Sequence, residues 1–222
     1  MQVLNNKSIQ KGNSKPSTRT RKRTNKNITP ELLLRLTLEM IDEHHSSKGV
    51  NLREIAKRAG CAHTNIYNYF KNLEELIWYA LAHSYKFLAQ YIMKKIGTEY
   101  NASQFFAKLI ESQIDFALEH PGLYRFMWLE PAPGTPPKSV MKYWNKFIDD
   151  FVLMIFALSD KKLNHEKCEI IAEIIMGYIH GEISDMIQLP KKKNTKEKER
   201  ITKNAQILLE ALINYYRKNQ LS

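Results

Sequence analysis

Apolar residues recur at spacings of three and four along most of the chain, which is typical of amphipathic helices. The first such stretch runs from Thr29-Pro30 to about His45 and places Leu33, Leu36 and Met40 on one helical face. Further stretches of this kind follow along the chain, at residues 52–59, 63–70, 73–96, 103–118, 122–130, 138–158, 165–188 and a last helix from Ile201. No alternating pattern long enough for a sheet is present. The sequence therefore predicts an all-α protein of about nine helices.

Two of the predicted helices are short and are separated by three residues, Gly60-Cys61-Ala62. Asn51 precedes the first and Asn72 follows the second, and each has an acidic residue three positions later, a helix-capping spacing. Gly60 can adopt the left-handed conformation that a sharp turn needs. The arrangement predicts a helix-turn-helix, whose second helix of roughly 12 Å would fit a DNA major groove.

The sequence IAKRAGC at 55–61, followed by IYNYFKNLEEL at 66–76, resembles the DNA-binding domain of the TetR (tetracycline repressor) family of bacterial regulators. The resemblance covers residues 28–75. Cys61 replaces a usual valine, and Leu73 replaces a lysine that contacts phosphate in the family. The segments HPGLYRFM at 120–127 and YIHG at 178–181 are similar to one C-terminal subgroup of the family.

The resemblance implies that the second short helix reads bases while the residues around its end contact the DNA backbone. The candidate base-facing residues are Ala62, His63, Thr64, Asn65 and Asn68. The candidate phosphate contacts are Tyr67, Tyr69 and Lys71, and Asn51 is a further candidate DNA contact. Asparagine pairs with adenine edges, and no arginine fork is present to favour guanine, so we expect an A/T-rich half-site. Phe70, four positions after Ile66, is expected in the core.

The resemblance also implies the organisation of the chain: a helix-turn-helix domain at 28–75 and a helical effector-binding and dimerisation domain at 76–222. The helix at 73–96 should join the two. Aromatic residues are frequent between 103 and 158, which is compatible with a cavity for a small apolar effector. The candidate lining residues are Gln113, Trp128, Trp144, Met176, Tyr178 and His180. The last two long helices would form a homodimer, and residues 191–203 between them are expected to be a solvated linker.

Charge adds a further feature to this picture. The formal net charge is +11, and residues 1–27 contribute eight basic residues and no acidic one. We expect this segment to be a disordered arm that contacts DNA, with Arg19, Arg21, Lys22 and Arg23 as candidates. A solubilising tail is the alternative. Residues 28–75 hold six basic and seven acidic residues, so this domain is not itself a strongly basic surface.

Several function classes are not expected. No run of 18 uncharged apolar residues and no secretory signal is apparent, which favours a bacterial cytoplasmic protein. His165 and Cys168, like His44 and His45, lack a second ligand pair, so we expect no metal. No phosphate-binding loop or catalytic motif is present, and we expect no cofactor and no enzyme activity.

The sequence thus favours a homodimeric transcriptional regulator that binds a pseudo-palindromic double-stranded DNA operator. By family habit we expect a repressor that a small-molecule effector releases. A non-regulatory architectural DNA-binding protein is the nearer alternative, and an all-helical small-molecule carrier or enzyme is the more distant one.

Overall fold

The computed structural model describes residues 28–97, 101–189 and 194–219. Every regular element within these ranges is a helix, which confirms the predicted all-α class. The elements are α1 (Pro30–His44), η1 (Ser47–Gly49), α2 (Leu52–Ala59), η2 (His63–Asn68), α3 (Leu73–Ile96), α4 (Ala102–Glu119), α5 (Pro121–Trp128), α6 (Lys138–Leu158), α7 (His165–Gln188) and α8 (Thr195–Lys218). Within the described part of the chain, the eight α-helices and the 3₁₀ helix η2 correspond to the nine helices expected, and η1 is an additional short turn.

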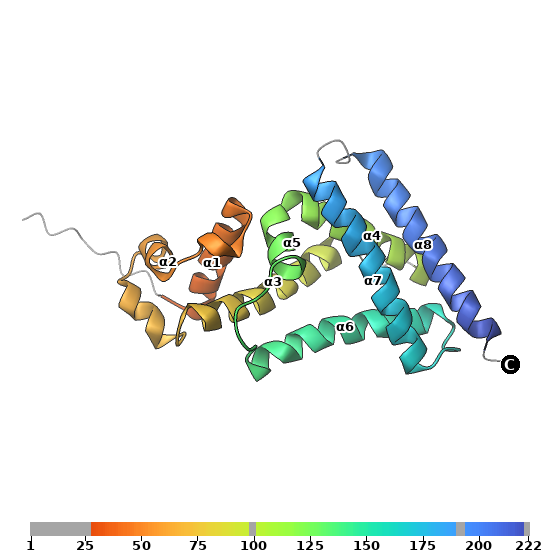
Figure 1. The fold of residues 1–222 in the computed structure, drawn as a ribbon, viewed down its shortest axis with the longest axis horizontal. Helices are drawn as coiled ribbons and strands as arrows, with labels where there is room; N and C mark the ends of the chain where they lie inside the picture. Colours follow the sequence, from red (N-terminus) through yellow and green to blue (C-terminus); the bar gives the residue numbers. More distant parts are fainter. Residues whose placement is uncertain (1–27, 98–100, 190–193, 220–222) are drawn as a thin grey trace, which may run out of the picture.

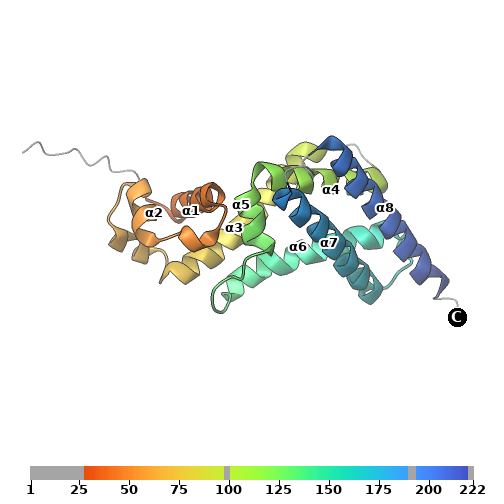
Figure 2. The same cartoon turned by 45° about the horizontal axis from the view of Figure 1, so that its top comes forward.

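The molecule is elongated, with two unequal parts. The head, residues 28–72, holds α1, α2 and η2 at one end of Figure 1, and the body holds α4 to α8. Figures 1 and 2 both show α7 and α8 side by side at the end of the body far from the head. None of the helices in the described ranges is long and apolar enough to cross a membrane.

Side-chain caps explain where most helices begin. The Thr29 hydroxyl accepts a hydrogen bond from the backbone N–H of Leu32, with Pro30 in the first turn of α1. Asparagine supplies the corresponding bond at the starts of α2, α3, α4, α7 and α8. The cap of α4 is Asn101, which with Gln104 forms a reciprocal capping box. These boundaries are therefore set by local sequence.

Helix α3 is the shared core element of the head and the body. Its buried residues at the N-terminal end, among them Leu76 and Ala80, pack on the head, and Leu88 and Ile92 continue the buried face into the body. The proposed division at residue 75 therefore falls inside one continuous helix. Any tilt of α3 would move the head relative to the body.

The start of α8 corrects one expectation. Residues 191–203 were expected to form a solvated linker, but α8 already begins at Thr195. Arg200 pairs with Glu197 one turn earlier at 2.9 Å and with Glu182 of α7 at 2.6 Å. Lys198 pairs with Asp115 of α4 at 2.6 Å. This charged segment is therefore helical because its basic side chains pair with carboxylates within α8 and on α4 and α7. Composition alone does not reveal these partners.

The head docks on the body through α1 and α5. The Nδ1 atom of His120 lies 2.7 Å from Oδ2 of Asp42, and the backbone N–H of Ser47 donates to Glu130 Oε2 at 2.9 Å. Gly122 is in the first turn of α5, and a Cβ atom built on it would be 2.6 Å from the Cα of Asp42. Only glycine allows this close approach of α5 to α1 without a shift.

Candidate nucleic-acid interface

The helix-turn-helix predicted from the sequence is present in the head. Gly60 has a φ of 75°, and the backbone N–H of Cys61 donates to the Ala56 carbonyl at 2.9 Å, closing α2. Ile55 and Ile66 are fully buried, and Phe70 is 4% exposed, as expected for the core face. The turn therefore holds η2 against α2 through apolar contacts and leaves the other side of η2 to solvent.

The second helix differs from the prediction in type and length. It is a 3₁₀ helix over His63–Asn68 instead of a helix over 63–70. No side chain caps its start, and at its end the backbone N–H groups of Tyr69 and Phe70 both donate to the Ile66 carbonyl, at 2.9 and 3.0 Å. Because a 3₁₀ helix rises about 2 Å per residue, its six residues still span about 12 Å.

The structure leaves the candidate contact residues accessible. Ala62, His63, Thr64, Asn65 and Asn68 are all exposed. The side chains of the two tyrosines are also accessible, since Tyr67 is 51% and Tyr69 40% exposed. Between residues 62 and 70, only Ile66 and Phe70 are buried. The segment therefore presents polar and aromatic groups on a rigid apolar base, which suits recognition of a groove and its flanking phosphates.

Tyr69 also fixes the start of the described chain. Its hydroxyl donates a 2.8 Å hydrogen bond to the carbonyl oxygen of Ile28. The candidate residues Arg19, Arg21, Lys22 and Arg23 lie outside the described residues. The point from which they extend is nevertheless held beside the end of η2.

Three other candidate positions have local structural partners. Asn51 caps α2 by accepting from the N–H of Glu54 at 3.0 Å. The backbone N–H of Lys71 donates to the Glu75 carboxylate, and the Lys71 side chain is exposed. Leu73, where the family commonly has lysine, is partly buried against the core. At this position a leucine adds apolar contact at the start of α3 and supplies no charge.

One basic residue was missed by the sequence reasoning. Arg53, in the first turn of α2, is exposed and has no ion pair among the described residues. By contrast, Arg58 is held by Glu43 at 2.8 Å, and this hydrogen bond lowers the pKa of the Glu43 carboxyl. Arg53 lies two residues after the Asn51 cap, at the N-terminal end of α2. This position could have identified it from the sequence as a candidate phosphate contact.

The candidate effector residues are not gathered around one cavity. Gln113 lines a cavity of about 220 Å³ between α3, α4 and α6, together with Phe105, Phe147 and Met154. Trp128 and Trp144 line a second cavity of about 330 Å³ between α3, α5 and α6. Met176, Tyr178 and His180 line neither cavity.

Aromatic packing separates the two body cavities. The ring of Tyr85 makes edge contacts with Trp128 at 5.7 Å and Trp144 at 5.3 Å, and it lies 5.5 Å from Phe147. His180 packs on Trp128 at 4.8 Å, and its Nδ1 is 2.6 Å from the Tyr124 hydroxyl. His180 therefore belongs to a packed ring cluster rather than to a cavity wall.

Two half-buried carboxylates outside the head also have structural partners. Glu130 binds Ser47 across the head–body contact, and Glu182 binds Arg200. Within the described ranges, no three histidine, cysteine, aspartate or glutamate side chains are placed to hold a metal ion.

Within the described residues, a head with an exposed helix-turn-helix is joined by one long helix to a helical body. Comparison with solved structures identifies this fold as that of TetR-family transcriptional regulators, which match the chain across nearly its full described length. No protein-family model and no curated protein matches the sequence.

Three solved structures illustrate the similarity. A protein of unknown function from Rhodococcus sp. RHA1 has a TM-score of 0.70 at 17% identity, covering 86% of this chain and 99% of its own. A TetR-family regulator from Streptomyces coelicolor has a TM-score of 0.65 at 17% identity, covering 86% and 83%. The fatty acid degradation regulator FadR from Bacillus halodurans has a TM-score of 0.59 at 15% identity, covering 85% and 96%.

Proposed function

We propose that this protein is a TetR-like, sequence-specific DNA-binding transcriptional regulator of the bacterial cytoplasm. The observation that carries the proposal is the exposed polar face of η2 held on buried Ile66 and Phe70. Asn65 and Asn68 would read bases, while Tyr67, Tyr69 and Lys71 contact phosphates. Basic residues in 1–27 would add phosphate or minor-groove contacts, and the bond between Tyr69 and Ile28 supports this because it holds Ile28, the first described residue, beside η2.

The active form would be a homodimer through α7 and α8. Exposed apolar side chains on these helices support this, since Ile174 is 41%, Ile207 54% and Tyr215 61% exposed. Gly177 and Gly181 are also exposed on α7, where they would permit close approach of a partner helix. A two-fold dimer places two heads on successive half-sites, so the operator would be a pseudo-palindrome.

The sharpest test of DNA recognition by the head compares two substitutions. Each variant is measured on the DNA sites that the wild-type protein prefers, found by in vitro selection. Asn65→Ala should change the preferred base at one half-site position, with a loss of about 1–3 kcal/mol at that base pair. Tyr67→Phe should instead weaken binding by a similar factor on all sequences, because phosphate contacts carry no base information. Affinities measured on a set of single-base operator variants check both results.

Glu166→Gln is a suitable control, since Glu166 is exposed at the start of α7, away from the head. The control should leave both affinity and base preference unchanged. An equal loss on every sequence for both head variants would contradict base reading by Asn65 and favour an architectural DNA-binding protein.

The protein would act as a repressor that a small apolar effector releases. The cavity between α3, α4 and α6 is the best candidate site because its walls are largely apolar and Gln113, 6% exposed, supplies a polar group. Occupation of this cavity would move α3 and therefore the head. Coupling of about 1–3 kcal/mol corresponds to roughly 5- to 150-fold in operator affinity.

A screen of small apolar compounds by thermal shift tests the effector step. A compound that raises the melting temperature should lower operator affinity by a factor in the range given above. Ala89→Asp should abolish both effects while preserving operator binding, because residue 89 is exposed and lines the cavity, so the new carboxylate disfavours an apolar compound without filling the cavity. A compound that stabilises the protein through this cavity and leaves operator affinity unchanged would exclude effector release.

A further inference from the structure

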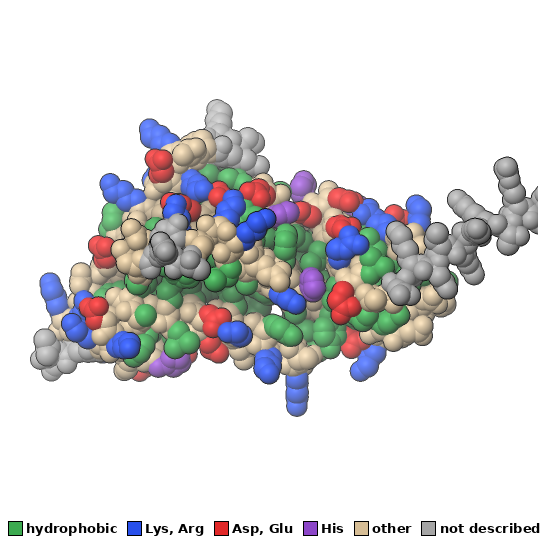
Figure 3. Space-filling model, turned by 180° about the vertical axis from the view of Figure 1, so that it is seen from behind, with side chains coloured by type: hydrophobic (Ala, Val, Ile, Leu, Met, Phe, Trp, Pro, Cys, Tyr) green, Lys and Arg blue, Asp and Glu red, His purple; other side chains and the backbone are tan. Residues whose placement is uncertain are grey.

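A separate and larger cavity lies at the junction of the head and the body. Its volume is about 610 Å³, and its walls come from α1, α3 and the start of α5. Figure 3 shows hydrophobic side chains lining a hollow between the two parts, with charged residues and histidines at its edges. A cavity of this size can hold a drug-sized organic molecule. It shares no residue with the cavity between α3, α4 and α6.

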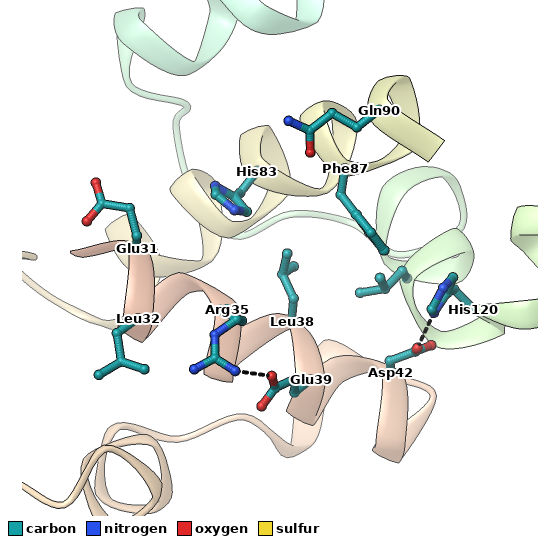
Figure 4. Close-up of a pocket in the computed structure, with 11 residues that line it drawn as sticks. Glu31, Leu32, Arg35, Leu38, Glu39, Asp42, His83, Phe87, Gln90 and His120 are labelled. Carbon is teal, nitrogen blue, oxygen red and sulfur yellow. Dashed lines mark hydrogen bonds and ion pairs between the residues drawn. The ribbon is translucent and has the colours of Figure 1, made fainter. Parts of the chain in front are cut away.

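The inner surface of this junction cavity is apolar. Figure 4 shows Leu38 of α1 and Phe87 of α3 directed into the space between the two helices. Leu123 of α5 adds a third apolar wall residue. Leu38 and Leu123 are buried, and Phe87 is half-buried with one edge packed on the His120 ring at 5.3 Å. These residues would contact the apolar part of a ligand.

The rim of the same cavity carries more negative than positive charge. Three carboxylates line it, from Glu31, Glu39 and Asp42, against the single guanidinium of Arg35. Arg35 is paired with Glu39, with 2.7 Å between Nη1 and Oε1. Among the residues that line the cavity, carboxylates therefore outnumber lysine and arginine side chains by two.

One of the two histidines that line the cavity adds no charge near pH 7. Burial, together with nearby Lys86, lowers the pKa of His83, so its imidazole is neutral near pH 7. His120 is engaged with Oδ2 of Asp42, while the buried Oδ1 of Asp42 has no hydrogen-bond partner among the described residues. A carboxylate with an unsatisfied oxygen favours additional positive charge close to it.

We propose that the cavity between α1, α3 and α5 binds an amphipathic organic cation, with an apolar body and one ammonium or quaternary ammonium group. The body would pack on Leu38, Leu123 and Phe87. The cationic group would lie toward Glu39 at the rim. An anion of the same shape would meet the excess carboxylates and bind more weakly.

The location of this site gives the ligand a consequence for the head. Its walls belong to both α1 and α3–α5, so a bound molecule contacts the head and the body at once. A ligand that fills the cavity favours one head position over others. This consequence for DNA rests on the proposed function, whereas binding of the cation does not and is measured without DNA.

Isothermal titration calorimetry on the full-length protein tests the proposal with two probes of similar shape. The cation is (4-phenylbutyl)trimethylammonium, and the anion is 5-phenylpentanoate. We expect the cation to bind once per chain and at least about tenfold more tightly than the anion, with affinity that decreases as salt is raised.

Charge variants at the rim locate the site. Glu39→Gln removes one carboxylate and leaves Arg35 without its described partner, so it should lower the affinity for the cation about two- to fivefold. Arg35→Gln should raise the affinity for the cation by a similar factor. Both side chains are well exposed, so neither substitution threatens the fold. Glu166→Gln, in the first turn of α7, is the matched control and should change nothing.

Three results would overturn the proposal: no binding of the cation, equal affinity for the two probes, or cation binding that neither Glu39→Gln nor Arg35→Gln alters. The last would place the bound cation elsewhere. Because no DNA is present, a negative result here leaves the proposed operator binding intact. Loss of operator binding in the Asn65 and Tyr67 experiments would equally leave this site intact.

Discussion

Acidification from pH 7 to pH 4.5 should lower the free energy of unfolding by about 2 kcal/mol through His180 alone. Its imidazole lies against Trp128 and receives or donates a hydrogen bond at Tyr124, and burial lowers its pKa to about 4. The unfolded chain has a histidine pKa near 6.5. Between these values the unfolded state binds the extra proton, so stability is present above pH 6.5 and is lost as the pH falls toward 4.

Urea unfolding of the wild type and His180→Gln at both pH values, at one protomer concentration, measures this contribution. Other groups also make the protein less stable in acid. Burial raises the pKa values of carboxylates such as Asp115 and Glu130, but their hydrogen-bond partners lower them further, so protonating these groups costs folding stability. The difference between the two proteins isolates His180, and the variant should show a smaller acid loss by about 2 kcal/mol. An NMR titration of the folded protein with a His180 midpoint near 6.5 would contradict the explanation.

Gly122→Ala should destabilise the protein by about 1–3 kcal/mol, although alanine is the better helix former. The added Cβ would meet backbone atoms, 2.6 Å from the Ile41 carbonyl oxygen and 2.6 Å from the Asp42 Cα. Backbone atoms cannot move aside as a flexible side chain can, so α5 must retreat from α1. The contacts of His120 and Glu130 with the head should lengthen with it.

Thermal and urea unfolding check this loss, and operator affinity reports the displaced head. Asn145→Ala is the control, at an exposed position in the middle of α6 where alanine is also the better helix former. It should be neutral or stabilising by up to about 1 kcal/mol, with the oligomeric state measured alongside. Equal stability changes for the two variants would show that the close approach at Gly122 is not a constraint.

Local sequence determined much of the fold. Caps such as Thr29 and the repeated asparagines specify helix starts because their side chains bond backbone N–H groups only three residues away. The same applies to the turn at Gly60, where glycine has the lowest cost for a positive φ. The four-residue spacing of Ile66 and Phe70 likewise predicted that Phe70, just after η2, is buried with Ile66.

Tertiary context changed two local predictions. Residues 63–68 form the 3₁₀ helix η2, and Ile66 and Phe70 hold this segment against the core of the head. The early start of α8 depends on Arg200 and Lys198 finding carboxylates on α7 and α4. A charge run alone is equally compatible with a solvated linker, since the partners are not its sequence neighbours.

The sequence by itself determined the helical class, the helix-turn-helix and the polar residues of η2 that the head leaves exposed. Only the tertiary structure decided that Trp128 and His180 join one ring cluster while Gln113 lines a different cavity. It alone also placed Gly122 against Asp42 and formed the junction cavity. The physical reason is range: caps and periodicity act within one or two helical turns, whereas these contacts depend on how whole helices pack against each other.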